Sequence, residues 1–510
     1  MSSFAGHGGG AAFRPDSLVD ALRWRAEHQS DRRAYTFLVD GDTTEAHLTY
    51  ADLDRRARAI GAHLQALGAV GERVMLVCPP GLEYVSAYWG CLYAGAVAVP
   101  SYPPRANRTT DTLLAIVRDS GARVALATAQ TRADVERDFA RASGLPSVQI
   151  VATEGLTDDA AGAWRHPGAR LDTLAFLQFT SGSTGMPKGV MVSHGNLIAN
   201  MTAAWGAVHM TPESVPFSWL PPFHDMGLIS GVIHPVFAGL TGLLMAPAAF
   251  IQRPVRWLRA VSRYRVTHSG GPPFAYEYCL RKIAPDQLDG VDLSTWETAY
   301  VGAEPIRVET LERFAATYAP HGLRSSALMP CYGMAEATLM VSGGPRVDRP
   351  VAFVADAAAL EANRVLAPGA GGARALAGCG QTLEDTSVVI ANPETLRRCA
   401  PGEVGEIWVS APGVAQGYWN KSAESEQTFR ARLADSSERP FLRTGDLGFV
   451  NGGQIFVTGR HKDLIILKGK NHYPQDIEHT VEHCHPALRP SGVAAFSIDQ
   501  VDGEQLVVVQ

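Results

Sequence analysis

The sequence LAFLQFTSGSTGMPKGVMVSH, from Leu174 to His194, carries the clearest pattern in the chain. Its apolar start, Leu174–Phe179, predicts a buried strand. Small, hydroxylated and basic residues follow: Thr180, Ser181, Gly182, Ser183, Thr184, Gly185, Pro187, Lys188 and Gly189. Such a loop lets an anion approach the backbone N–H groups, and Lys188 adds positive charge. The spacing of a Walker A loop is absent. We therefore interpret the stretch as a polyphosphate-binding loop rather than an ordinary Gly/Ser-rich surface loop.

The composition is that of a globular protein with more than one domain. The chain has 510 residues, enough for two or more domains of ~100–200 residues. A net charge of -6 argues against nucleic-acid binding. Seven cysteines without a C-x-x-C pair, and no signal peptide, predict reduced thiols and a cytoplasmic protein. Because His234, Pro235 and Pro247 interrupt the apolar segment 231–250, we expect a buried helix and the strand Gly242–Met245 rather than integral membrane association.

Strands and helices alternate through the first 300 residues, which predicts an α/β fold with parallel, doubly wound sheets. We expect helix over Ser17–Leu67 apart from one strand, with Thr49 as an N-cap. The predicted strands are Ala34–Val39, Arg73–Cys78, Ala96–Val99, Val124–Ala127, Val148–Val151, Phe217–Leu220, Leu243–Met245, Val266–Ser269 and Ala299–Val301. The predicted helices are Leu82–Ala94, Thr112–Ser120 and Arg132–Arg141.

The pattern changes in the last third of the chain. Short alternating runs at Ser387–Ile390, Val404–Val409 and Gln454–Val457 predict a small β region. A second change falls at Gly459, and a helix is expected from Pro474.

Two groups of residues follow predicted strands, where ligands of parallel sheets commonly bind. The first is His224, Asp225, Met226 and Gly227; its alternative is a His that merely caps a helix. The second is Gly302, Ala303 and Glu304, whose small residues would allow a planar ring to approach the backbone.

Two further groups offer side chains suited to a nucleotide. The first is Tyr332, Gly333, Met334, Ala335 and Glu336. In it, Tyr332 presents a face for stacking and Glu336 a hard oxygen ligand for Mg²⁺. The second is a carboxylate in a tight turn, Asp446, with Arg460 after it. A carboxylate can accept from both ribose hydroxyls, and a guanidinium can bind phosphate.

One short pattern points elsewhere. His479, Glu482 and His483 match H-x-x-E-H, an inverted zinc-protease pattern. Because the pattern is short and the chain holds 16 histidines, we give little weight to a zinc hydrolase.

Taken in order, the phosphate loop, Gly302–Pro305, Tyr332–Glu336, Thr444–Asp446 and Gly459–Asp463 resemble the motifs of the adenylate-forming superfamily, over almost the whole chain. The resemblance implies an adenylate-forming fold. Residues 1–458 would form two doubly wound subdomains plus a small β-barrel at about 381–458. Residues 459–510 would begin a mobile α+β domain.

The same resemblance implies ATP and Mg²⁺ as cofactors. Thr180–Thr184 and Lys188 would hold phosphates, Glu336 and Thr184 the metal, Tyr332 adenine and Asp446 ribose. Four residues are the expected catalytic group: Lys188, His224, Glu336 and Arg460. His224–Gly227 would face the substrate, and Lys462 matches the hinge of the mobile domain.

Within the superfamily, His224–Leu228 and Tyr332–Leu339 look like fatty acyl-AMP ligases. Ala335 stands where common acyl-CoA synthetases usually have Thr. Residues 348–372 are a candidate for the insertion that in those ligases restrains the small domain and disfavours CoA. The resemblance implies activation of a fatty acid to acyl-AMP with release of pyrophosphate. The acyl group would then pass to the phosphopantetheine thiol of an acyl carrier protein in polyketide or lipopeptide biosynthesis.

Two alternatives remain at this point: a fatty acyl-CoA synthetase and a non-catalytic acyl-adenylate-binding module. The second arises because the superfamily has a Lys near its C-terminus that would fall after Gln510. We therefore expect the chain to be a fragment of a longer protein.

Overall fold

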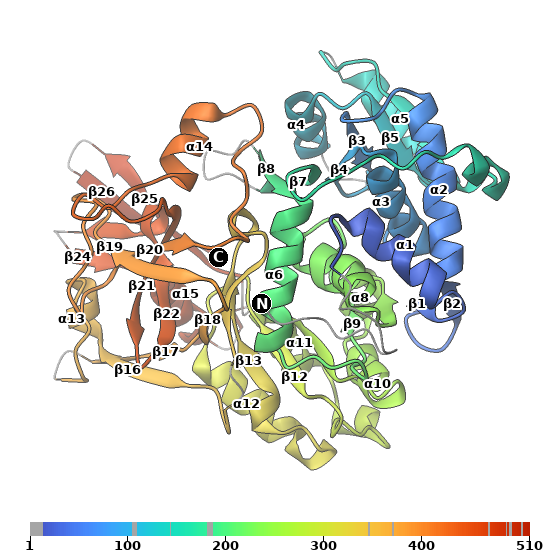
Figure 1. Cartoon of the computed structure of the whole chain (residues 1–510). Coiled ribbons are helices and arrows are strands. Elements are labelled where there is room, and N and C mark those ends of the chain that lie inside the picture. The colour runs from blue at the N-terminus through green and yellow to red at the C-terminus, as the bar shows by residue number, and fades with distance from the viewer. Residues whose placement is uncertain are drawn as a thin grey trace.

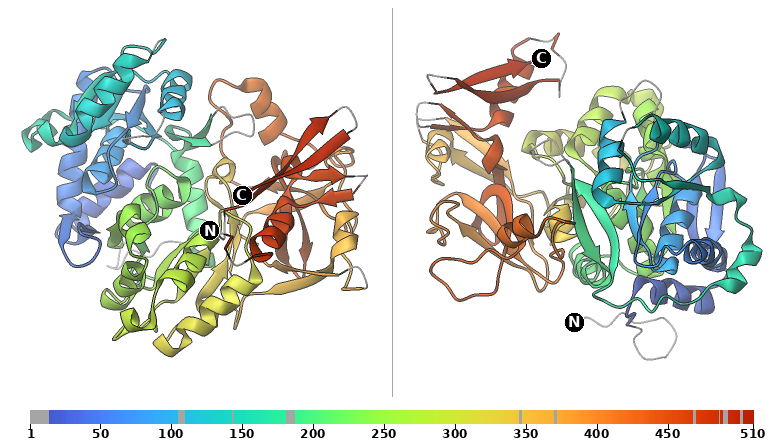
Figure 2. Two further views of the ribbon diagram at one scale, coloured as in Figure 1. Left: turned by 180° about the vertical axis from the view of Figure 1, so that it is seen from behind. Right: turned by 90° about the horizontal axis from the view of Figure 1, so that it is seen from above.

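The computed structural model describes residues 14–104, 110–142, 144–180, 187–344, 347–369, 372–467, 470–485, 487–488, 492–500 and 503–510. A helix-rich N-terminal body lies beside a β-rich C-terminal body (Figure 1). Seen from above, the two bodies stand next to each other, with the last hairpin at the edge of the β-rich one (Figure 2).

The first sheet of the N-terminal body has the strand order β6-β5-β3-β4-β7-β8. All but β8 run parallel, and β8 is antiparallel to β7. The strands are β3 (Arg73–Leu76), β4 (Val97–Pro100), β5 (Val124–Ala127), β6 (Gln149–Ala152), β7 (Leu174–Thr180) and β8 (Lys188–Ser193). The helices are α2 (Tyr50–Ala66), α3 (Leu82–Ala94), α4 (Asp111–Ser120) and α5 (Ala129–Arg141).

Helices cover both faces of this sheet, because alternate strand side chains point to opposite sides. Val74 and Leu76 pack with α2 and α3, whereas Met75 packs with α4 and α5. The doubly wound arrangement is confirmed. Thr49 caps α2 through a capping box with Asp52, as the sequence predicts.

A second layer combines the sheet β2-β1-β10-β9 with the parallel sheet β11-β12-β13. An isolated parallel bridge, Pro216 to His268, joins them. The strands are β1 (Arg33–Leu38), β2 (Glu45–Thr49), β9 (Phe217–Ser218), β10 (Gly242–Met245), β11 (His268–Gly271), β12 (Thr298–Val301) and β13 (Leu328–Pro330). The helices are α6 (His194–Ala207), α8 (His234–Ala238), α9 (Pro247–Gln252), α10 (Val255–Arg263), α11 (Pro273–Lys282) and α12 (Val308–Tyr318).

Strand β2 differs from the sequence prediction, which placed helix there. Asp40 makes the hairpin possible, because its Oδ1 accepts from the backbone N–H groups of Asp42, Thr43 and Thr44. The strand lies at the edge of its sheet and buries none of its residues fully. Its hydrophobic alternation is therefore too weak to predict a strand.

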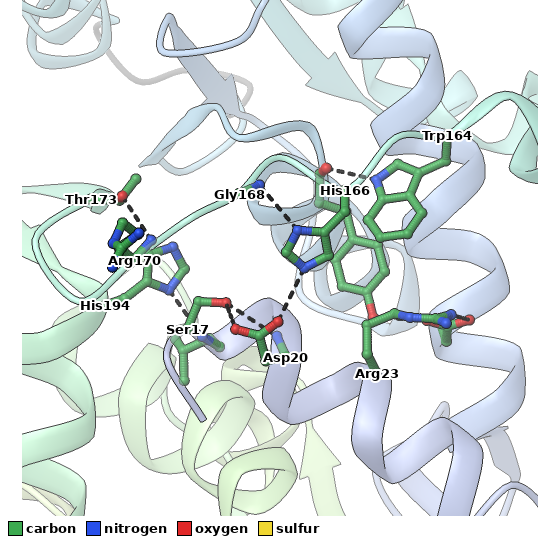
Figure 3. A network of polar contacts seen from close by, with 12 residues as sticks. Ser17, Asp20, Arg23, Trp164, His166, Gly168, Arg170, Thr173 and His194 are labelled. Carbon is green, nitrogen blue, oxygen red and sulfur yellow. Dashed lines mark hydrogen bonds and ion pairs between the residues drawn. The ribbon is translucent and has the colours of Figure 1, made fainter. Parts of the chain in front are cut away.

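A polar network connects the first helix, α1 (Leu18–His28), to His166 and to the start of α6 (Figure 3). The Leu18 N–H donates to Nδ1 of His194 at 3.1 Å, where α6 begins. His166 Nε2 lies 3.1 Å from Oδ1 of Asp20. Because His194 is buried, its pKa falls to about 4. Its ring is therefore a neutral acceptor, which suits the helix N–H that it binds.

The apolar segment 231–250 forms a π-helix, η3 (Leu228–Ile233), then α8 and strand β10. This confirms a buried helix followed by a strand. In the described parts of the chain, no helix combines the length and apolar character needed to cross a bilayer.

The C-terminal body consists of antiparallel sheets. They have the orders β14-β15-β18 and β19-β20-β21-β22, accompanied by three hairpins. The sheet strands are β14 (Tyr332–Gly333), β15 (Met340–Gly343), β18 (Gln381–Thr382), β19 (Ser387–Ala391), β20 (Gly405–Ser410), β21 (Leu442–Asn451) and β22 (Gln454–Arg460). The hairpin strands are β16 (Ala352–Asp356), β17 (Ala373–Ala377), β23 (Ile465–Leu467), β24 (Lys470–His472), β25 (Ala494–Gln500) and β26 (Gly503–Val509). The helices are α13 (Ala357–Glu361), α14 (Ser422–Phe429) and α15 (Pro474–His483). The predicted β region is confirmed as sheet; its closure into a barrel stays a prediction.

Candidate active site

The stretch from Leu174 to His194 contains two antiparallel strands, β7 and β8, with the predicted phosphate loop between them in the sequence. Thr180 ends β7 and pairs with Lys188, which begins β8. Ser181, Gly182, Ser183, Thr184 and Gly185 lie outside the described residues. Lys188 therefore belongs to a strand rather than to the loop, because the alternating run after it pairs with β7. Thr180 and Lys188 thus face each other at the mouth of the loop.

Residues 416–419 pair with the free edge of β8. The Met191 N–H donates to the Gly417 carbonyl, and the Trp419 N–H to the Gly189 carbonyl, both at 2.8 Å. This pairing places the ring of Tyr418 5.2 Å from Nζ of Lys188. Lys188 Nζ also lies 2.5 Å from Oε2 of Glu424 on α14. Sequence reasoning missed both Tyr418 and Glu424, since neither stands in a pattern that marks a ligand.

Glu336 lies on the short helix η7 (Ala335–Ala337). The hydroxyl of Tyr418 donates to its Oε1 at 2.8 Å. Burial raises the pKa of Glu336, and this hydrogen bond opposes the rise. The turn before it requires glycine, since a Cβ on Gly333 would collide with the Leu339 carbonyl. Glu336 is thus held at a fixed place by backbone packing and by one hydroxyl.

The donor set around Glu336 fits Mg²⁺. The ion usually takes one or two carboxylates plus waters and substrate phosphates. No group of three His, Cys, Asp or Glu side chains that could hold a metal occurs among the described residues. Glu336 offers one such carboxylate. Thr184, the other predicted metal contact, lies outside the described residues.

Asp446 is held from two sides. The Tyr332 hydroxyl donates to Oδ2 at 2.7 Å, and Arg460 Nε donates to Oδ1 at 3.1 Å. The pairing of β21 with β22 aligns Asp446 with Arg460. Burial raises the pKa of Asp446, and the Arg460 charge opposes the rise. Each carboxylate oxygen keeps lone pairs that can accept from a hydroxyl. The sequence-predicted Tyr332, Asp446 and Arg460 are thus brought together.

His224 stands at the carboxyl end of β9, just before the one-turn helix α7 (Asp225–Gly227). Its Nδ1 lies 2.6 Å from Oδ1 of Asp225, and 58% of its side chain is exposed. The hydrogen bond to Asp225 raises the pKa of His224. Two hydrogen bonds fix the preceding backbone: Tyr84 donates to the Pro222 carbonyl and Gln178 to the Phe223 carbonyl. An accessible imidazole on a rigid turn can meet a substrate.

Gly302, Ala303 and Glu304 follow β12. Gly302 packs over Cys331, where a Cβ would come 2.9 Å from the sulfur. Ala303 adopts a φ of 73°, in the left-handed region. Non-glycine residues hold such backbone at a cost of about 1–3 kcal/mol, and they cluster at functional sites. Gly333, Met334 and Ala335 follow soon after Cys331 in the chain, from the end of β14 to the start of η7.

Two other predicted residues act on the charge of Glu336. Burial is the main cause of its raised pKa, the Asp225 charge raises it further, and the Arg460 charge lowers it. Lys462 lies after Arg460 on η8 (His461–Asp463) and is exposed. Of the zinc-like pattern, Glu482 instead pairs with Arg307 at 3.3 Å.

Comparison with known proteins identifies the family. The profile of the AMP-binding enzyme family matches residues 22–419. The chain is 45% identical to a medium-chain-fatty-acid–[acyl-carrier-protein] ligase of Moorena producens, covering 97% of this chain and 85% of that protein. It is 37% identical to a long-chain-fatty-acid–AMP ligase of Mycobacterium tuberculosis, covering 97% and 86%. A fatty acyl-adenylate ligase of Legionella pneumophila, solved with acyl adenylate and pyrophosphate, superposes with a TM-score of 0.84. The two sequences are 41% identical, and the superposition covers 97% of this chain and 86% of the Legionella chain. The chain therefore belongs to the family of AMP-binding enzymes, and its fold is that of the fatty acyl-adenylate ligases.

Proposed function

We propose that the protein is a fatty acyl-AMP ligase. In this proposal it uses ATP and Mg²⁺ to convert a fatty acid to acyl-adenylate and pyrophosphate. It then passes the acyl group to the phosphopantetheine thiol of an acyl carrier protein. The observation that carries the proposal is the link through Tyr418, whose hydroxyl donates to Glu336 at 2.8 Å and whose ring lies 5.2 Å from Lys188 Nζ, together with the pair of Asp446 and Arg460. These residues would supply a metal ligand, a ribose acceptor and two cations.

The chemistry needs no general base for its first step. A fatty carboxylate resembles Glu, with a pKa of about 4.3, and is ionised at neutral pH. The obstacle is repulsion between that carboxylate and the triphosphate. Lys188 and Arg460 place positive charge where the transferred phosphate and its leaving group carry negative charge. Mg²⁺ bound at Glu336 would supply further neutralisation of the leaving pyrophosphate.

Positioning of the nucleotide and the fatty acid would be the second contribution to the rate of adenylation. Asp446 would hold the ribose hydroxyls, and the Tyr332 ring would stack on adenine. Gly302 and Ala303 would line the adenine with backbone. His224, exposed on its rigid turn, would face the fatty carboxylate. Holding the two reactants in line can contribute several kcal/mol of barrier reduction, on the order of 7 or more.

The choice of acceptor is assigned to residues 348–372 and strand β17 behind them. Arg374 of β17 lies 3.2 Å from Asp476 of α15, with its guanidinium 4.3 Å from the Tyr473 ring centre. Asn471 donates to Asn363 at 3.2 Å, and His472 lies 3.5 Å from Glu361. A cavity of about 70 Å³ remains at this contact. These mostly polar contacts support a breakable restraint between the insertion and the segment after Lys462, and with it rejection of CoA.

Two further parts of the proposal concern setting and pathway. All seven cysteines are free thiols, which supports a reducing, cytoplasmic location. The relative from Moorena producens is named for an acyl-carrier-protein acceptor, and this name supports the carrier protein as partner. A role in polyketide or lipopeptide biosynthesis follows from that partner.

The test is a paired acceptor assay. The protein, ATP, Mg²⁺ and a panel of fatty acids are incubated with either a phosphopantetheinylated carrier protein or CoA. Acyl-AMP and acyl-thioester are then measured by mass spectrometry. The proposal predicts acyl-AMP in every productive reaction and thioester on the carrier protein rather than on CoA. Thioester formed mainly on CoA would replace it with an acyl-CoA synthetase, and bound acyl-AMP without any turnover would replace it with a binding module.

A further inference from the structure

The cation at the mouth of the phosphate loop already has a protein anion. Lys188 Nζ lies 2.5 Å from Oε2 of Glu424, and only 20% of the Lys188 side chain is exposed. The Tyr418 ring covers the ammonium from another side at 5.2 Å. A polyphosphate that binds Lys188 must therefore approach a cation whose charge is partly neutralised.

Glu424 is placed next to Lys188 by the way α14 begins. Ser425, one residue on, accepts from the Tyr418 N–H at 2.8 Å and donates to the Lys421 carbonyl at 2.7 Å. Lys421 in turn lies 3.7 Å from Asp119 of α4. The first turn of α14 is thus fixed to residues 416–419, which pair with β8. The Glu424 backbone cannot withdraw, whereas its side chain, 46% exposed, can rotate into solvent.

The surroundings of Glu424 favour its ionised form. Its hydrogen bond to Lys188 lowers the pKa of Glu424, and the charges of Lys421 and Lys462 lower it further. A carboxylate displaced from Lys188 would thus remain in the field of two other cations. One of them, Lys462, is the residue that matches the hinge.

We propose that Glu424 is an affinity-determining residue of the polyphosphate site, a built-in counter-anion that ATP and pyrophosphate must displace from Lys188. The inference rests on the proposed function, in which Lys188 binds polyphosphate. It follows that Glu424 weakens the binding of both substrate and leaving group. A weaker grip on pyrophosphate speeds its departure, so the residue favours turnover over retention of the product.

The test compares Glu424→Gln with wild type by calorimetric titration with inorganic pyrophosphate, in the presence and absence of Mg²⁺. The variant keeps the shape of the side chain and removes its charge. Because exposed ion pairs contribute up to about 1 kcal/mol, we expect pyrophosphate to bind up to about five-fold more tightly to the variant. The gain should shrink at high salt, since the charges are accessible to screening ions.

Glu426→Gln is the matched control. Glu426 lies on the same helix, and its side chain pairs with the exposed Arg430 at 3.5 Å. The Glu426→Gln variant should bind pyrophosphate with the same affinity as the wild type. Equal gains in both variants would show a general effect of net charge and would overturn the inference.

Lys188→Met separates this inference from the function on which it rests. If Lys188 binds polyphosphate, Lys188→Met weakens pyrophosphate binding, and adding Glu424→Gln then changes nothing further. An unchanged affinity in Lys188→Met would contradict the role of Lys188 itself. A weakened Lys188→Met together with an unchanged Glu424→Gln would overturn only the counter-anion.

Discussion

Removing the Tyr418 hydroxyl should make adenylation sensitive to acid. Tyr418→Phe keeps the ring over Lys188 and deletes the donor that lies 2.8 Å from Glu336 Oε1. Burial already raises the pKa of Glu336, and the hydroxyl holds it down. Without the hydroxyl the pKa rises further, so the ionised carboxylate that the reaction needs is lost at a higher pH.

The size of the effect follows from the strength of such a bond. A hydrogen bond to a charged group contributes about 1.5–3 kcal/mol, and about 1.4 kcal/mol changes an equilibrium ten-fold. We therefore expect turnover in Tyr418→Phe to fall about ten-fold or more on the acid side, with the loss shrinking as the pH rises. Fatty-acid-dependent pyrophosphate release, measured across pH, gives the profile.

Tyr278→Phe is the matched control, because the Tyr278 hydroxyl donates to the Ile251 carbonyl rather than to Glu336. Its pH profile should coincide with that of wild type. A Tyr418→Phe profile lowered equally at every pH would show that the hydroxyl only supports the structure and would refute its action on Glu336.

Three further predictions concern other parts of the protein. Glu336→Gln should lower turnover with little change in ATP affinity, whereas Tyr332→Ala should mainly weaken ATP binding, because stacking acts alike on ground and transition states; equal effects of both on kcat would contradict these roles. Deleting residues 348–372 should let some acyl-CoA form when CoA is supplied, and so should Arg374→Ala, which breaks the pair with Asp476. The control Arg398→Ala loses an exposed pair with Glu438 and should form no acyl-CoA. His194, whose pKa is lowered to about 4, binds a proton in the unfolded chain below its usual 6.5, so stability should fall as the pH drops from about 6.5 to about 4, by about 2 kcal/mol at pH 5. Replacing His194 by Gln should flatten the fall in the urea midpoint between about pH 7 and about pH 5.

The local sequence pattern was sufficient to predict those elements whose own residues show a clear run of apolar side chains. Helix α3 and strand β5 have the predicted bounds because continuous apolar runs end there at turn residues. The capping box at Thr49 is likewise a local signal. Strand β2 was missed because it buries no residue fully and depends on the turn at Asp40. For β8, the sequence gives the alternation after Lys188, but the position of Lys188 depends on pairing across the loop.

The candidate site divides in the same way. The sequence singles out Asp446, Glu336 and Arg460 as candidates because each stands in a motif of small residues and turns. Their contacts were not predictable, since the Tyr332–Asp446 bond joins residues 114 positions apart in the chain. Tyr418 and Glu424 contact Glu336 on η7 and Lys188 on β8, which folding brings to them. No spacing within their own segment could indicate that.

The measurement closest to the central claim is the exchange of labelled pyrophosphate into ATP, with and without a fatty acid. Exchange requires reversible formation of an acyl-adenylate, so it reports the first chemical step without any acceptor. The account predicts exchange that depends on the fatty acid and is lost in Glu336→Gln, while Glu426→Gln retains it. Exchange that proceeds without a fatty acid, or that survives in Glu336→Gln, would contradict the assignment of this site.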